Sequence, residues 1–230
     1  MKVEKFKKSR RKRWTLLFCL GLLIGTTYLL GWSGVFSVKH IVVEGAPSSA
    51  ESVLLENSVH IGDKLARLET KNLSRTLTAF PWLERSLISR NWLTGTVTIH
   101  VWTRTPIAIT DEKLIDRFGR KFELPGIMGV GLPRIDASTP VEQLLAVKVL
   151  LELPNQLRDS LRTITATGTH SVRLLVQEKS LTTPRTISII WGDLSNTELK
   201  SRVYAALIAL PENKKISLVD VSAPHAPIVR

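Results

Sequence analysis

One stretch of the sequence constrains the chain more than any other, because no charged residue occurs between Trp14 and Val38. Its apolar part, Trp14 to Trp32, is nineteen residues long. At about 1.5 Å per residue, a helix of this length reaches roughly 28 Å and matches a hydrocarbon core of about 30 Å. Aromatic residues lie at both ends, as they do at membrane interfaces. We therefore predict a single N-terminal transmembrane helix over residues 14–34.

The thirteen residues before this stretch are strongly basic. They hold eight Lys and Arg side chains and a single acid, Glu4, whereas the rest of the chain carries 24 basic and 19 acidic residues. The net charge of +12 therefore mostly reflects the tail. Because positive charge beside a membrane helix stays inside the cell, we predict a cytoplasmic tail at residues 1–13 and an exported body. A short tail at a bilayer is better suited to anionic lipid headgroups than to nucleic acid, so no nucleic-acid partner is expected.

Two other interpretations of the apolar stretch stay open. A cleaved signal peptide also has a basic start and an apolar core, but the residues around Trp32 offer no good cleavage site of small residues. A buried helix of a soluble domain is the other alternative, and the basic tail and the length of the run argue against it. We expect an uncleaved anchor in the cell membrane.

Residues 36–106 have the pattern of a small α+β domain. Thr96 to Thr103 alternates strictly, which predicts that Val97, Ile99 and Val101 face a core while His100 and Trp102 face away. Hydrophobic spacing and helix-start signals complete the unit. The predicted order is β-α-α-β-β, with strands at residues 38–44, 83–90 and 96–103 and helices that begin near Ser48 and Thr70.

Residues 107–230 are predicted to form a second, β-rich domain with two helices, so that the fold class of the whole chain is α+β. One helix begins at Pro140, and the other follows Ser195. Ser48 and Ser195 each precede a Glu by three residues, which predicts a capping box at both helix starts. The last predicted strand covers residues 216–221.

The order of elements and several short runs resemble the FtsQ/DivIB family of bacterial cell-division proteins. In that family a β-α-α-β-β module, the POTRA domain, precedes a β domain. The resemblance implies a POTRA domain at residues 36–106 and a β domain at residues 107–230. The matching runs are Phe36 to Gly45, Pro81-Trp82, Arg90 to Trp92, Thr103 to Ala108, Asp116 to Gly119 and Val219 to Ser222.

The sequence contains no recognisable catalytic, cofactor or metal site. Its five histidines are scattered without ligand spacing, and Cys19 is the only cysteine. Neither a metalloprotease nor a serine-hydrolase motif is present. We therefore expect a protein that is not an enzyme and needs no cofactor. A membrane-anchored exported hydrolase or transpeptidase of cell-wall metabolism is the alternative.

The resemblance implies a scaffold of the divisome that links cytoplasmic and exported division proteins through protein–protein contacts. It implies a single-pass protein of the inner membrane at the division septum, with the body outside the cytoplasm. The implied partners are divisome proteins of the FtsB and FtsL type, together with septal peptidoglycan synthase subunits.

The end of the chain supplies a candidate contact site. A strand near a chain end with no later strand to cover it is expected at a sheet edge, where another chain adds as a further strand. In the FtsQ/DivIB family the matching strand receives the FtsB-type subunit. The predicted partner-binding residues are Ser217, Leu218, Val219, Asp220, Val221 and Ser222.

Overall fold

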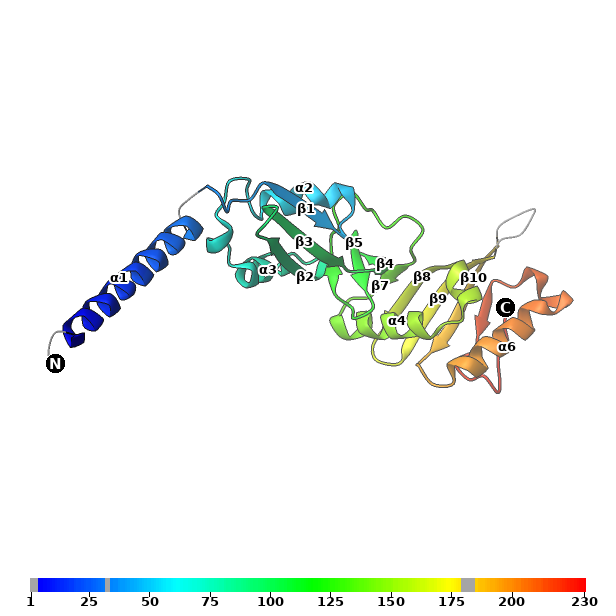
Figure 1. The fold of residues 1–230 in the computed structure, drawn as a ribbon. Coiled ribbons are helices and arrows are strands. Elements are labelled where there is room, and N and C mark those ends of the chain that lie inside the picture. The colour runs from blue at the N-terminus through cyan, green and yellow to red at the C-terminus, as the bar shows by residue number, and fades with distance from the viewer. Residues whose placement is uncertain (1–3, 32–33, 179–184) are drawn as a thin grey trace. The chain divides into compact units, whose positions relative to one another are not determined.

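The computed structural model describes the backbone of residues 4–31, 34–178 and 185–230, and its fold class is α+β. The chain divides into two compact units, Met1–Thr103 and Arg104–Arg230, and each is described by itself (Figure 1).

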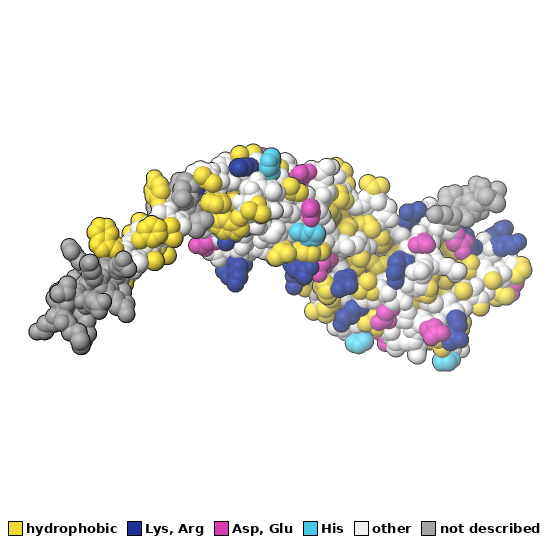
Figure 2. Space-filling model, viewed as in Figure 1, with side chains coloured by type: hydrophobic (Ala, Val, Ile, Leu, Met, Phe, Trp, Pro, Cys, Tyr) yellow, Lys and Arg dark blue, Asp and Glu magenta, His cyan; other side chains and the backbone are white. Residues whose placement is uncertain are grey.

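Helix α1 (Glu4–Gly31) corrects the prediction of a membrane span. It joins the basic residues from Lys5 to Arg13 and the apolar residues from Trp14 to Gly31 in one helix. Hydrophobic side chains are exposed along its described part (Figure 2). Trp14 and Phe18 are among them. Small and polar residues such as Gly21, Gly25 and Thr26 lower its hydropathy. Among the described residues, no helix combines the length and the hydropathy that crossing a bilayer requires. The predicted transmembrane helix at residues 14–34 is therefore wrong.

After α1, the first unit forms a three-stranded sheet with helices on one face. The sheet order is β1-β3-β2, with β1 parallel and β2 antiparallel to β3. The predicted order β-α-α-β-β is present, with one added 3-10 turn. The elements are β1 (His40–Glu44), α2 (Ser48–Glu56), η1 (Leu65–Arg67), α3 (Thr70–Thr78), β2 (Leu83–Asn91) and β3 (Thr96–Thr103).

The core of this unit lies between β3 and the helices. Val97, Ile99 and Val101 are buried as predicted. Leu54 of α2 and Leu77 of α3 are buried as well. Gly45, which follows β1, has a φ of +85°, and a Cβ atom there would lie 2.2 Å from the carbonyl oxygen of Val101. Only glycine fits this close approach of two backbones.

The second unit is a nine-stranded mixed sheet in the order β12-β11-β10-β9-β8-β7-β4-β5-β6. Its described part has three α-helices where two were predicted, because α5 adds a short turn before β8. The elements are β4 (Pro106–Thr110), β5 (Lys113–Asp116), β6 (Lys121–Phe122), β7 (Arg134–Asp136), α4 (Pro140–Glu152), α5 (Asn155–Ser160), β8 (Leu161–Thr167), β9 (Ser171–Glu178), β10 (Arg185–Gly192), α6 (Thr197–Ala209), η2 (Pro211–Lys215), β11 (Leu218–Asp220) and β12 (Ile228–Val229).

The helices of the second unit pack on one face of this sheet (Figure 1). Alternate residues of the central strands point into the core that they share with the helices. This core includes Leu174, Ile189 and Trp191 from the strands together with Leu150 of α4 and Tyr204 of α6. The other set of alternate residues forms an open face, which none of the described helices covers.

A buried carboxylate holds the turn between β5 and β6. Asp116 Oδ1 accepts hydrogen bonds from the backbone N–H groups of Phe118 (2.8 Å) and Arg120 (2.9 Å). Its other oxygen accepts a hydrogen bond from Arg104 at 2.9 Å, and only 3% of Asp116 is exposed. Gly119 closes the turn with a φ of +78°. Removing one partner of such a buried ion pair leaves the other charge uncompensated.

The first turn of helix α6 contains a buried lysine. Lys200 is fully buried, and its ammonium group donates to the carbonyl oxygen (2.9 Å) and the carboxylate (3.0 Å) of Asp193. The Asp193 carboxylate also accepts from the Ser195 hydroxyl at 2.5 Å. The hydrogen bond from Ser195, followed by that from Lys200, holds the pKa of Asp193 well below its usual value. The negative charge of Asp193 therefore stabilises the fold.

We predict that Asp193→Asn lowers the melting temperature of the full chain at neutral pH. Because the folded-state pKa of Asp193 is depressed, its contribution is fully present above the ordinary carboxyl pKa of about 4 and declines progressively as the pH falls from there toward the much lower folded-state pKa. Thermal melts of both proteins between pH 7 and pH 3 check this. The difference between the two melting temperatures should be constant down to about pH 4 and begin to shrink between pH 4 and pH 3. A difference that does not shrink at the acidic end would contradict the assignment.

We predict that Ile99→Asp unfolds the first unit. Ile99 is fully buried, and an unpaired carboxylate in an apolar layer costs several kcal/mol, which a small domain cannot spare. Thr98→Asp is the matched control, since Thr98 is the preceding residue on β3 and is half-buried on the other face. Circular dichroism melts of the two variants check the prediction, and equal melting temperatures would show that the assigned faces are wrong.

Candidate partner-binding site

The predicted edge strand lies inside the sheet. Strand β11 pairs in parallel with β10 and in antiparallel fashion with β12, so that it has a neighbour on both sides. Val219 lies opposite Val229, and Asp220 lies opposite Ile228. The prediction that residues 216–221 form an uncovered edge is therefore wrong, because the last residues of the chain return along β11 and cover it.

The six predicted residues divide between the two faces of the sheet. Val219 and Val221 are fully buried in the core on the helix face. Leu218 and Asp220 are half-buried on the open face, and Ser217 and Ser222 are exposed. This division follows from the two-residue period of a strand. In the folded chain another protein can reach the side chains of Ser217, Leu218, Asp220 and Ser222, but not those of Val219 and Val221.

Strand β12 is the edge that the sequence did not predict. Leu218 and Arg230 exchange two backbone hydrogen bonds, with N···O distances of 3.0 Å and 2.9 Å. In an antiparallel ladder, hydrogen-bonded pairs alternate with non-hydrogen-bonded pairs. The next pair, Val219 and Val229, is therefore a non-hydrogen-bonded one, and the N–H and C=O groups of Val229 point away from β11. They form the outer edge of the sheet.

A compact turn brings the chain back to this position. Asp220 Oδ1 accepts hydrogen bonds from the backbone N–H (2.9 Å) and the hydroxyl (2.7 Å) of Ser222. The Ala226 N–H donates to the Ala223 carbonyl at 2.9 Å. Pro227 then precedes two β-branched residues, a combination that favours an edge strand. This short signal was the only one in the sequence for β12.

The open face beside the edge carries four apolar side chains, Leu175, Leu218, Ile190 and Ile228, with Ser188 and Asp220 among them; we call these four the apolar strip. Ser188 on β10 lies opposite both Leu175 and Leu218, and residues opposite one another share a face. In the next row, Ile190 lies opposite Asp220, which in turn lies opposite Ile228. Leu175 and Ile228 are 37% and 51% exposed. Backbone donors at the edge and apolar contacts on the adjoining face therefore occur together.

The first unit offers a second, more polar surface. His100 and Trp102 lie on the face of β3 that the helices do not cover, as predicted, with ring centroids 4.2 Å apart. The Arg85 guanidinium lies 3.7 Å from the Trp102 ring centroid. His100 Nδ1 lies 3.0 Å from a carboxylate oxygen of Glu44. The polar groups of these side chains are therefore paired within the unit, whereas the backbone groups of Val229 at the C-terminal edge point outward.

The part of the chain that the structure describes holds no group of three or more His, Cys, Asp or Glu residues placed to bind a metal ion. The arrangement at the C-terminal edge instead provides backbone hydrogen bonds and apolar surface, which are the elements of protein–protein contact.

The structure defines a two-unit α+β protein, in which a small unit with a three-stranded sheet is followed by a unit with a large mixed sheet and helices on one face. No protein-family model matches it. The chain is 24% identical over 163 residues to the cell division protein FtsQ of Salinibacter ruber. The aligned part makes up 64% of this chain and spans 61% of the length of that relative. This likeness confirms the resemblance to the FtsQ/DivIB family.

Proposed function

We propose that the chain is a non-enzymatic scaffold of the bacterial divisome that acts at the division septum. The likeness to a cell-division FtsQ protein supports this role. In this proposal the chain holds other division proteins together through protein–protein contacts. Its partners are division proteins of the FtsB and FtsL type together with septal peptidoglycan synthase subunits.

Each of the two regions that follow helix α1 has its own function. Residues 36–106 act as a POTRA domain, which is a module for protein contact, and residues 107–230 act as the β domain. The order β-α-α-β-β of the first region and the nine-stranded sheet of the second support the assignment of two domains.

The contact that carries the proposal is the edge of the nine-stranded sheet. An FtsB-type segment adds as a strand beside β12, where the N–H and C=O groups of Val229 point outward. Backbone pairing at an edge supplies affinity, and pockets for alternate side chains supply specificity. The contact includes residues 217–222 through their accessible members, with Leu218 and Asp220 on the adjoining face and Ser222 at the end of the strand.

The edge is too short to bind a partner by backbone pairing alone. Strand β12 comprises Ile228 and Val229, and Pro227 before it has no N–H to donate. The apolar strip that contains Leu175, Ile190 and Ile228 therefore contributes a substantial part of the affinity. Burying apolar surface is worth about 25 cal/mol per Å².

We predict that Val229→Pro weakens binding of the FtsB-type partner and leaves the fold intact. Proline removes the one N–H that points outward, and an edge strand tolerates proline where its N–H faces solvent. Val229→Thr is the matched control, because threonine keeps both the N–H and the branched side chain. Titration of the purified partner should give roughly tenfold weaker binding for the proline variant, as expected for a hydrogen bond of about 1 kcal/mol with some loss of strand geometry.

Equal affinities of the two variants, with equal melting temperatures, would rule out strand addition at β12. The first unit would then become the better candidate for the partner contact, starting with the surface around Trp102.

We predict that Leu175→Glu also weakens partner binding, because it places a charge in the apolar strip. Leu175 is 37% exposed, so the substitution should change the melting temperature little. Thr167→Glu is the control, since Thr167 is an exposed residue at the far end of β8. A binding titration of both variants should show a loss only for Leu175→Glu, and equal losses would exclude a specific contact with the strip.

A further inference from the structure

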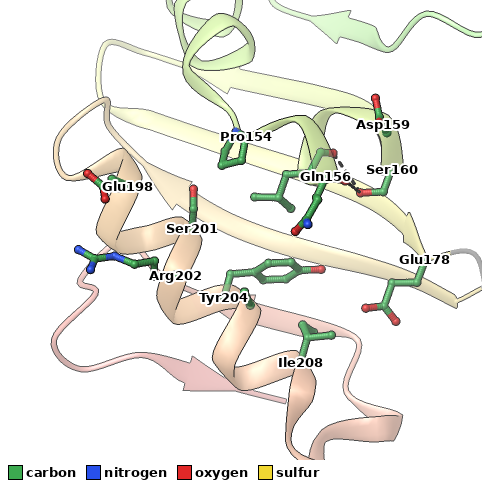
Figure 3. A pocket seen from close by; sticks show the side chains of 12 residues that line it. Pro154, Gln156, Asp159, Ser160, Glu178, Glu198, Ser201, Arg202, Tyr204 and Ile208 are labelled. Atoms are coloured by element: carbon green, nitrogen blue, oxygen red, sulfur yellow. Dashed lines mark hydrogen bonds between the residues drawn. The ribbon is translucent and has the colours of Figure 1, made fainter.

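A cavity of about 700 Å³ lies on the helix face of the second unit, between α5 and α6 (Figure 3). Its volume is within the range of sites that bind small molecules or side chains. The proposed edge contact uses the opposite face of the same sheet. The cavity is therefore a separate feature, and its role does not depend on the proposed function.

The floor of the cavity is apolar. Leu157 of α5 and Tyr204, Ala205 and Ile208 of α6 line it, together with Pro154 before α5. Figure 3 shows the Tyr204 ring extending from α6 across the space between the two helices. An aliphatic chain that enters the cavity would contact these side chains. Both the chain and the cavity wall would then bury apolar surface that was exposed to water, which favours binding.

Tyr204 is the aromatic residue of the cavity, and only 7% of it is exposed. Its ring points toward Glu178, and its hydroxyl opens into the cavity (Figure 3). Burial, and then the negative charge of Glu178, raise the pKa of Tyr204 to about 12. The group is thus a neutral hydroxyl at neutral pH. Because this hydroxyl faces the cavity beside an apolar ring, it can exchange a hydrogen bond with the polar end of a ligand.

The rim of the cavity carries more negative than positive side chains. Asp159, Glu178 and Glu198 all line it, and Arg202 is the one basic residue among the lining residues that the structure describes. Glu178 also pairs with Arg185 at 2.7 Å, while Arg185 donates to two backbone carbonyls. A cationic group in the cavity would approach Glu178 and donate to the Tyr204 oxygen, whereas an anionic group would be repelled.

We propose that this cavity is a docking site for a segment of another protein that presents a Lys or Arg side chain between apolar residues. Such side chains combine an aliphatic stem with a charged head. The stem contacts Leu157 and Ile208, and the head reaches Tyr204 and Glu178. The flanking apolar residues of the segment occupy the remainder of the cavity.

The test uses two short peptides and the ¹⁵N-labelled full chain. The first probe is acetyl-Ser-Leu-Lys-Leu-Ser-amide, and the second has Glu in place of Lys. The lysine peptide should shift the amide signals of Leu157, Tyr204 and Ala205 in a saturable manner. The glutamate peptide should bind at least tenfold more weakly, as expected when one ion pair is exchanged for a like-charge contact.

Three variants show whether the cavity itself binds the peptide. Tyr204→Phe removes only the hydroxyl and should weaken binding of the lysine peptide roughly ten- to a hundredfold, the usual range for one hydrogen bond to a charged group. Ala205→Arg fills the cavity and should abolish binding. Ala206→Arg is the matched control, because Ala206 is the next residue on α6, is also exposed and does not line the cavity.

Several results would overturn the proposal. Equal affinity for the two peptides would exclude a cation site, and equal loss in Ala205→Arg and Ala206→Arg would exclude the cavity. If free n-butylammonium binds as tightly as the lysine peptide, the cavity is a site for small cations and not a docking site. Failure of the Val229→Pro test would leave this proposal unaffected, since the edge and the cavity lie on different parts of the unit.

Discussion

The pairing of β12 with β11 determines what the second unit can offer to another chain. Two residues, Ile228 and Val229, close one side of a nine-stranded sheet. Without them, β11 would expose the backbone of a strand whose Val219 side chain belongs to the core. With them in place, the outward N–H and C=O of Val229 are the groups at the edge, and a partner strand can pair there without disturbing the core.

The two-residue period of the strands separates stability from recognition in both units. On β3, Ile99 stabilises the core while Trp102 lies on the open face. On β11, Val219 is buried in the core while Leu218 and Asp220 lie on the face next to the edge. Substitutions on the open faces can therefore alter the binding of a partner at little cost in stability, whereas polar substitutions of the residues that face the core unfold the unit.

The sequence predicted the elements that have a long periodic pattern and missed those that depend on distant contacts. Strict alternation over eight residues identified β3, whereas two residues carry no period, so β12 was missed. The Ser-x-x-Glu pattern located two helix starts, but the capping boxes that it predicted do not form. No side chain caps α2 or α6, and the Ser195 hydroxyl binds Asp193. A capping box does form at Thr139 and Glu142. The sequence placed the candidate site on β11 but gave no sign that residues 228–229 pair with that strand, because this pairing depends on the return of the chain in the folded structure.

Hydrogen exchange at the Val229 amide, with and without the FtsB-type partner, shows directly whether a partner strand pairs with β12. We expect fast exchange in the free chain, because this N–H points away from β11, and strong protection in the complex. The Val221 amide should be protected in both states, since it donates to the Ile190 carbonyl at 3.0 Å. A complex in which Val229 still exchanges freely, while amides of the first unit become protected, would contradict the account.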